Sequence, residues 1–184
     1  MDAGRTLAAL IFFALLSSSA LAHAHGVELP KRDALLIKKD RVSIRVQYVV
    51  ANNDEARVLL RLFDRDRSSS LDAPERDALR AHLCRQATSF LRLELDGKPL
   101  SLIEDHAELG SDLASVDIIL SAPLIEKQER GRHQLRLFDR HKDRRVVVPV
   151  RVTGNEVRIV SQLPPLTMLD AGQALEVSFE VTAQ

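Results

Sequence analysis

Side chains that carry oxygen recur at alternate positions of one short polar segment, residues 64–75. The candidate ligands fall at segment positions 1, 3, 5, 7, 9 and 12: Asp64, Asp66, Ser68, Ser70, Asp72 and Glu75. Calcium is a hard cation that binds six to eight oxygens, and alternate residues of a tight turn can direct such oxygens inward. The spacing therefore predicts a site for calcium.

The neighbourhood of this segment resembles the EF-hand family over roughly residues 56–87. Leu71 stands at loop position 8, where that family needs an apolar anchor. A helical stripe of apolar residues precedes the loop over residues 55–63, and residues 73–90 show the apolar period of a helix. The resemblance implies a single, degenerate helix–loop–helix hand in which Glu75 is a bidentate ligand.

The loop departs from the family pattern in ways that weaken binding. Position 6 holds Ser69 in place of glycine, which costs about 1 kcal/mol if its backbone is left-handed. Arg65 and Arg67 add two cations to the loop. Only one hand is visible, so we expect a dissociation constant of about 10⁻⁴–10⁻³ M. The alternative also stands that Asp72 and Glu75 only cap a helix, with no ion bound.

Alternating apolar residues around this segment predict β-strands. Residues 34–37 and 42–50 precede the predicted helices, and a strand over residues 91–95 follows them up to an Asp96-Gly97 hairpin turn. The further strand candidates are residues 100–103, 116–120, 134–138, 146–152, 157–160 and 175–181. We therefore expect a mainly β fold, an antiparallel Ig-like sandwich with an EF-hand-like helix–loop–helix inserted at about residues 55–90.

The hexapeptide Leu-Arg-Leu-Phe-Asp-Arg occurs twice, at residues 60–65 and 135–140. A second calcium loop is not expected, because Arg145 and Val150 stand where Ser70 and Glu75 stand in the first copy. We interpret the repeat as coincidence, with the second copy in a strand that ends at a charged turn.

The first 22 residues have the three parts of a signal peptide. Arg5 precedes an apolar stretch, and small residues end it at Ala22, although Ala24 also permits a cut. The apolar stretch is shorter than the ~20 residues that span a bilayer. We therefore predict a single domain over residues 23–184, with no membrane span in the mature chain, located in the periplasm or secreted.

Two histidines would lie at the new amino terminus. Cleavage after Ala22 places His23 first and His25 third, and an amino terminus with a third-position imidazole can bind copper or nickel in square-planar geometry. This arrangement is an alternative metal site, so a periplasmic copper or nickel binder is the first rival function.

The order of features also resembles a larger arrangement. A signal ending in Ala-His, a β-hairpin and an EF-hand-like insert that runs into a leucine-rich strand resemble the extracytoplasmic front domain of bacterial hydrogenase/urease-accessory, nickel-permease-like membrane proteins. That resemblance covers about residues 23–102, but no transmembrane segment follows, so transport is not implied. It suggests a second rival, an interaction domain with a vestigial metal loop that docks on a membrane partner.

Composition and motifs exclude several function classes. The 26 basic and 26 acidic residues give a formal net charge of zero, which argues against nucleic acid as a partner. No esterase elbow, phosphate loop or zinc-protease pair is present, and we expect no enzyme activity. Cys84 is the single cysteine, so it has no intramolecular disulfide partner and is expected to be a half-buried, small apolar residue. The favoured function is a binding or structural module with a weak calcium site.

Overall fold

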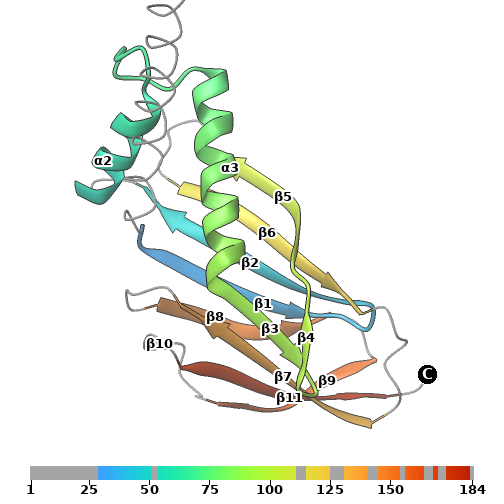
Figure 1. Ribbon diagram of the computed structural model, residues 1–184. Coiled ribbons are helices and arrows are strands. Elements are labelled where there is room, and N and C mark those ends of the chain that lie inside the picture. The colour runs from blue at the N-terminus through green and yellow to red at the C-terminus, as the bar shows by residue number, and fades with distance from the viewer. Residues whose placement is uncertain are drawn as a thin grey trace, which may run out of the picture.

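The protein is a sandwich of two β-sheets with a pair of helices at one end (Figure 1). The computed structural model describes residues 29–50, 54–110, 115–124, 131–140, 145–153, 156–163, 168–169 and 173–182. Within these residues the chain is mainly β, which confirms the fold class predicted from the sequence.

The first sheet has six strands in the order β10-β8-β1-β2-β6-β5. These strands are β1 Lys31–Ile37, β2 Arg41–Val49, β5 Ile103–Leu109, β6 Ser115–Pro123, β8 Arg145–Val152 and β10 Met168–Leu169. Neighbouring strands pair antiparallel except β1 and β8, which run parallel. The centre of this sheet is therefore formed by chain segments far apart in the sequence.

The second sheet has five strands in the order β4-β3-β7-β11-β9, all paired antiparallel. These strands are β3 Leu91–Leu95, β4 Lys98–Leu100, β7 Gly131–Asp139, β9 Val157–Leu163 and β11 Ala174–Val181. Asp96 and Gly97 connect β3 to β4 with φ values of 50° and 76°. Two central residues with positive φ are typical of a type I′ hairpin, so the predicted hairpin turn is confirmed.

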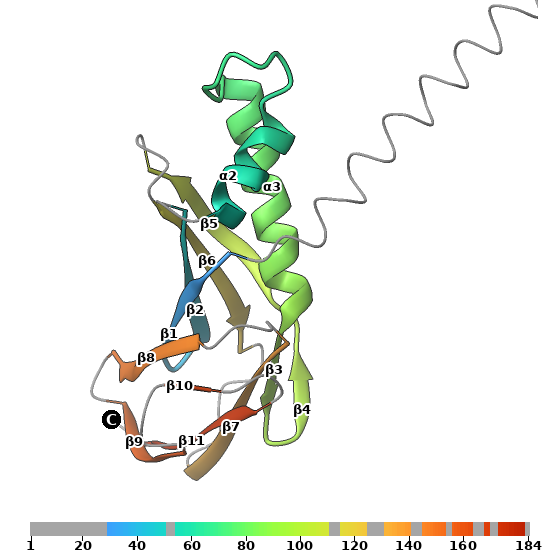
Figure 2. The same cartoon turned by 90° about the vertical axis from the view of Figure 1, so that its left-hand side faces the viewer.

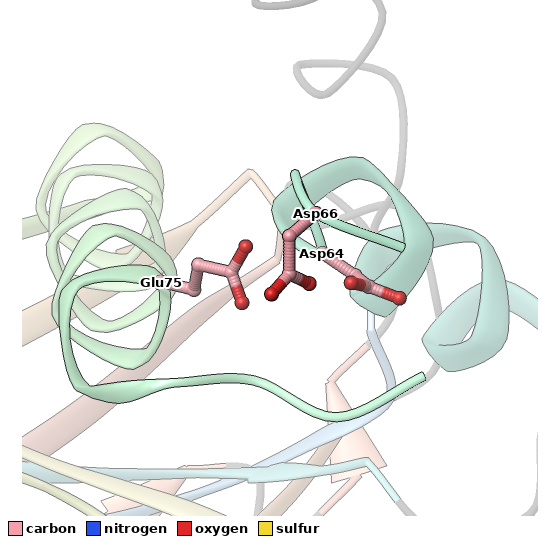
Figure 3. A group of neighbouring side chains, drawn as sticks. All are labelled: Asp64, Asp66 and Glu75. Atoms are coloured by element: carbon pink, nitrogen blue, oxygen red, sulfur yellow. The ribbon is translucent and has the colours of Figure 1, made fainter. Parts of the chain in front are cut away.

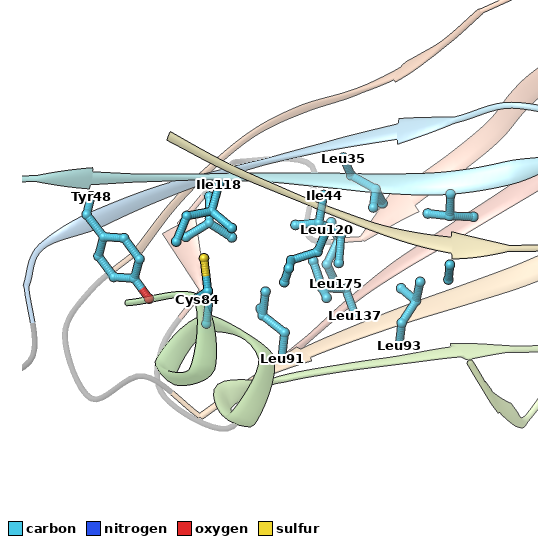
Figure 4. Packing of buried hydrophobic residues seen from close by; sticks show 14 of the residues in the cluster. Leu35, Ile44, Tyr48, Cys84, Leu91, Leu93, Ile118, Leu120, Leu137 and Leu175 are labelled. Atoms are coloured by element: carbon cyan, nitrogen blue, oxygen red, sulfur yellow. The ribbon is translucent and has the colours of Figure 1, made fainter. Parts of the chain in front are cut away.

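Alternation along the strands fills the space between the sheets. On β2 every second side chain is fully buried: Val42, Ile44, Val46 and Tyr48. Ile44 stands beside Leu120 of β6, and Figure 4 shows both within the packed core beneath the strands. The period-two pattern thus specifies which face of each strand enters the core.

The two helices, α2 Asp54–Phe63 and α3 Ala73–Phe90, fill the interval between β2 and β3. α3 packs against β5 and β6 and runs directly into β3, so one rigid element joins the helical end to the second sheet (Figure 2). Leu79, Leu83 and Ala87 are fully buried on the face that the sequence pattern selects. The position of the loop between the helices is therefore tied to the sandwich core.

Cys84 lies on the buried side of α3, and its sulfur points toward Ile118 of β6 (Figure 4). Its side chain belongs to the apolar cluster, as predicted for a small apolar residue, but it is more deeply buried than the half-burial that the sequence predicted. Burial is the main cause that raises the pKa of the Cys84 thiol, to about 12. At neutral pH it is a protonated, apolar core group.

Candidate metal centre

Asp64 lies where α2 ends, and its carboxylate fixes the turn that follows. Its main-chain N–H still donates to the Leu60 carbonyl at 2.9 Å, in helical fashion. Its Oδ1 accepts a hydrogen bond from the Ser68 N–H at 3.0 Å, and its Oδ2 accepts one from the Ser69 N–H at 3.0 Å. One carboxylate therefore holds the next five residues in a tight turn.

The tight turn requires left-handed backbone at two residues that are not glycine. Ser69 has φ of 66°, as expected for the loop position where the EF-hand pattern has glycine, and Arg67 has φ of 59°. Each costs about 1–2 kcal/mol relative to a right-handed conformation. The left-handed Arg67 was not predicted, because no glycine or asparagine marks its position. The hydrogen bonds to Asp64 hold both residues in place.

Glu75 brings the far end of the loop back to its beginning. It is the third residue of α3, and its carboxylate is buried, with 6% of the residue exposed. Its Oε1 accepts a hydrogen bond from the Arg65 N–H at 2.6 Å, and its Oε2 accepts one from the Asp72 N–H at 3.1 Å. The Arg65 bond closes a ring over residues 65–75, and both bonds aim the Glu75 carboxylate at the loop interior (Figure 3).

Three carboxylates meet inside this ring. Asp64, Asp66 and Glu75 each offer one oxygen, and these oxygens lie within 4.8 Å of one another (Figure 3). The pKa of Asp66 is lowered, first by the hydrogen bond from the Ser68 N–H at 2.9 Å, which favours its charged form. The negative charges of the three carboxylates repel one another at this separation, and a cation bound between their oxygens would remove that repulsion.

The other three predicted ligands lie on the loop but outside this carboxylate group. The Ser68 hydroxyl donates to the Ser70 carbonyl at 2.9 Å, so these two candidate ligand oxygens are neighbours. Asp72 is the N-cap of α3, and its Oδ1 accepts a hydrogen bond from the Glu75 N–H at 2.9 Å. Asp72 and Glu75 thus form a reciprocal capping box, as their spacing predicted.

We expect Asp72→Ala to lower the free energy of unfolding by about 1 kcal/mol, because it removes the N-cap oxygen from α3. Asp72→Ser keeps an oxygen at the cap and should lose only a few tenths of that amount. Urea unfolding followed by circular dichroism measures both variants. Equal losses for alanine and serine would contradict the capping role.

The loop also carries two basic side chains, Arg65 and Arg67. Both are exposed, so water screens their charges from the carboxylates. The two arginines therefore still repel a bound cation, but less strongly than two unscreened charges would.

The Asp105–His106 pair does not join this centre, and two predicted ligands cannot be placed. His23 and His25 lie outside the described residues, and the copper or nickel site stays a prediction. Asp105 and His106 are exposed on β5, the edge strand of the first sheet. His106 lies 3.7 Å from Glu108, also exposed. Asp105 and His106 therefore belong to the exposed surface of β5.

Sequence reasoning missed a buried charge cluster between the sheets. The Lys31 Nζ lies 2.9 Å from Asp33 Oδ2 and 2.6 Å from Asp139 Oδ2, and at most 1% of each side chain is exposed. Lys31 and Asp33 belong to β1, whereas Asp139 ends β7 in the opposite sheet. The sequence does contain a signal for this cluster. Lys31 and Asp33 occupy alternate positions of β1 in step with Leu35 and Ile37, so all four side chains face the core.

Burial dominates the electrostatics of this cluster. Desolvation raises the pKa of Asp33 to about 7 from 3.8; the Lys31 ammonium opposes that rise, and the neighbouring Asp139 carboxylate adds to it. When Asp33 carries a proton near neutral pH, the charged groups of the cluster are the Lys31 ammonium and the Asp139 carboxylate, and their charges sum to zero. The cluster is therefore a structural ion group whose charge depends on pH.

No protein-family model, no curated protein and no solved structure matches the chain. Among the described residues, no helix is long and apolar enough to cross a membrane. The case for function therefore rests on the loop geometry.

Proposed function

We propose that residues 64–75 form an EF-hand-like calcium site of low affinity in an exported, non-enzymatic binding or structural protein. The observation that supports this most strongly is the convergence of Asp64, Asp66 and Glu75, whose oxygens lie within 4.8 Å of one another. Three carboxylates on a tight loop are a ligand set suited to a hard divalent cation. Nitrogen and sulfur ligands, which softer metals prefer, are absent from residues 64–75.

Further oxygens for a calcium shell lie on the same loop. The Ser68 hydroxyl and the Ser70 carbonyl are 2.9 Å apart, and a bound ion would replace the hydrogen bond between them. Asp72 is engaged as the helix cap and would reach the ion through water, as position 9 commonly does. Glu75 uses one lone pair of each oxygen for main-chain N–H groups and retains others for bidentate coordination.

The consequence of binding is rigidity of the helical end. Asp64 follows the end of α2 and Glu75 lies in the first turn of α3, so one ion would link both helices. α3 continues into β3, which connects the site to the sandwich. A single hand has no partner hand to open against, so we propose a structural calcium site rather than a switch that exposes a groove.

Affinity is expected at about 10⁻⁴–10⁻³ M, the range of extracellular modules. Arg65 and Arg67 repel a cation and lower the affinity. The left-handed backbone at Ser69 and Arg67 is already formed without the ion, so its cost falls on the stability of the fold. An exported protein meets calcium at such concentrations, whereas the cytosol does not provide them. The proposed location and the proposed site therefore support each other.

Isothermal titration calorimetry of the purified protein with CaCl₂ tests the site. We expect one calcium per chain with a dissociation constant in the stated range, and at least a tenfold loss in Glu75→Gln. Glutamine also fits the third helical position of a capping box, so this variant removes the charge while keeping the helix start.

The matched control is Asp77→Asn, which makes the same acid-to-amide change at an exposed residue of α3, 3.6 Å from Arg80. It should bind calcium like the unaltered protein. Absence of heat at 10 mM CaCl₂, or equal losses in both variants, would contradict the proposal.

A further inference from the structure

The outer face of the six-stranded sheet carries a groove of about 570 Å³ over β8, β1, β2 and β6. It lies on the opposite face of the sheet from the core and well separated in sequence from residues 64–75. The four strands are neighbours in the sheet (Figure 1). Their outward side chains therefore form regular cross-strand rows. Nothing in the proposed calcium function makes use of this face.

The floor of the groove is apolar. Ala34 and Leu36 of β1 and Ile119 of β6 point outward and are half-buried. The register sets Leu36 beside Ser43 of β2, which is small enough to leave the floor open. An outward strip of this composition has the depth and the apolar surface to accept an apolar side chain.

Three arginines border this floor, and one of them is neutralised. Arg45 donates to Asp117 Oδ1 at 2.8 Å, and this hydrogen bond is the main cause that raises the Arg45 pKa. Arg32 and Arg151 are exposed and form no ion pair with any residue that the structure describes. Asp33 contributes only backbone here, because its side chain is buried on the inner face. Among the residues that the structure describes, the groove therefore carries two positive charges without a paired carboxylate, in a chain whose net charge is zero.

Arg32 and Arg151 have a defined separation. Arg151 stands opposite Leu36, so Arg32 and Arg151 are four residues apart along β1 and one strand apart across it. At about 3.3 Å per residue and 4.8 Å per strand, their main chains are ~14 Å apart. One phosphate or one carboxylate cannot reach both. In an extended peptide, however, side chains i and i+4 project from one face about 13 Å apart.

We propose that this groove binds an extended acidic peptide segment of another protein, with the side-chain pattern acidic–x–apolar–x–acidic. Its two carboxylates pair with Arg32 and Arg151, and its central apolar side chain covers Ala34 and Leu36. This interaction is independent of the calcium site. A flat anionic membrane fits less well, because the floor between the arginines is recessed and the remaining surface supplies no net positive charge.

Fluorescence anisotropy with the labelled peptide acetyl-Glu-Ser-Leu-Ser-Glu-amide tests the proposal. We expect saturable binding that weakens with salt, and at least tenfold weaker binding for Arg32→Glu, for Arg151→Glu and for a peptide with lysine in place of both glutamates. Moving the glutamates to i and i+2 should also weaken binding, because two carboxylates at that spacing cannot contact Arg32 and Arg151 at the same time.

The control variant is Arg132→Glu, which reverses an exposed arginine on the outward face of β7 in the other sheet. It should bind the peptide like the unaltered protein, and thermal melts should confirm that all variants fold. Equal losses in Arg132→Glu and Arg32→Glu would overturn the proposal. So would binding to phosphatidylglycerol vesicles that depends on Arg32 when no peptide binds.

Discussion

Replacing Lys31 with methionine is expected to lower the free energy of unfolding at pH 7 by about 3–5 kcal/mol. The Lys31 ammonium is fully buried and contacts two carboxylates from opposite sheets, those of Asp33 and Asp139. Methionine fills similar volume but supplies no charge, so a carboxylate charge stays buried without a counter-ion. Removing one member of a buried ion group costs far more than the group itself contributes, because the remaining charge is left desolvated.

Urea unfolding with linear extrapolation measures this loss. The matched control is Lys39→Met, since the Lys39 Nζ lies 3.0 Å from Glu156 Oε1 in an ion pair whose lysine side chain is 45% exposed. Exposed pairs contribute about 0–1 kcal/mol, so the control should be nearly neutral. If Lys31→Met were as mild as Lys39→Met, the buried cluster would not be formed as described.

Replacing Asp33 with asparagine is expected to remove the pH dependence of stability that this residue causes. The folded protein keeps a proton on Asp33 up to about pH 7, whereas the unfolded chain loses it near 3.8. Unfolding therefore releases a proton between these values, and this residue makes the protein less stable as pH rises through that window. Below pH 3.8 the contribution of Asp33 to the free energy of unfolding is constant and favourable. Above about pH 7 that contribution is completely lost, a difference of a few kcal/mol.

Asparagine mimics the protonated carboxyl group at every pH, because its oxygen can accept from Lys31 and its amide can donate to Asp139. We expect Asp33→Asn to match the unaltered protein near pH 3.5, and to exceed its stability by an amount that grows as the pH rises to 8. Urea unfolding at several pH values gives the two curves, with Asp40→Asn at an exposed residue as the control. Parallel curves for Asp33→Asn and the unaltered protein would contradict the raised pKa.

The helical end was the most predictable part of the fold, because its signals are local. Asp72, Pro74 and Glu75 mark the start of α3, and the structure begins the helix at Ala73. The spacing of the loop oxygens likewise placed Asp64, Asp66 and Glu75 together, although Asp72, predicted with them, caps α3 instead. A turn and a helix cap depend on residues within one short segment, and the sequence shows these directly.

What could not be predicted depends on neighbours that are distant in the sequence. β5 extends over Ile103–Leu109, beyond the strand expected at residues 100–103, because an edge strand with mostly exposed side chains lacks apolar alternation. Lys31 and Asp33 were missed because charged residues rarely face a core, and their partner Asp139 lies in another sheet.

The repeated hexapeptide shows the same limit most clearly. Its first copy ends α2 and places Asp64 in the loop, whereas its second copy lies in β7 and places Asp139 in the buried cluster. The interpretation of the second copy as a strand agrees with the structure. Identical residues form a helix in one place and a strand in the other, because β3 and β11 pair with the second copy. Tertiary contacts override the local preference here.

A calcium titration followed residue by residue with ¹⁵N amide NMR tests the central claim most directly. If calcium binds residues 64–75, the amide signals of Arg65, Ser68, Ser69 and Asp72 should shift together and saturate with one dissociation constant, because their N–H groups donate to the proposed ligand carboxylates. Signals on β9, at the far edge of the second sheet, should stay in place. Unchanged loop signals at 10 mM calcium, or shifts spread evenly over the protein, would contradict the claim.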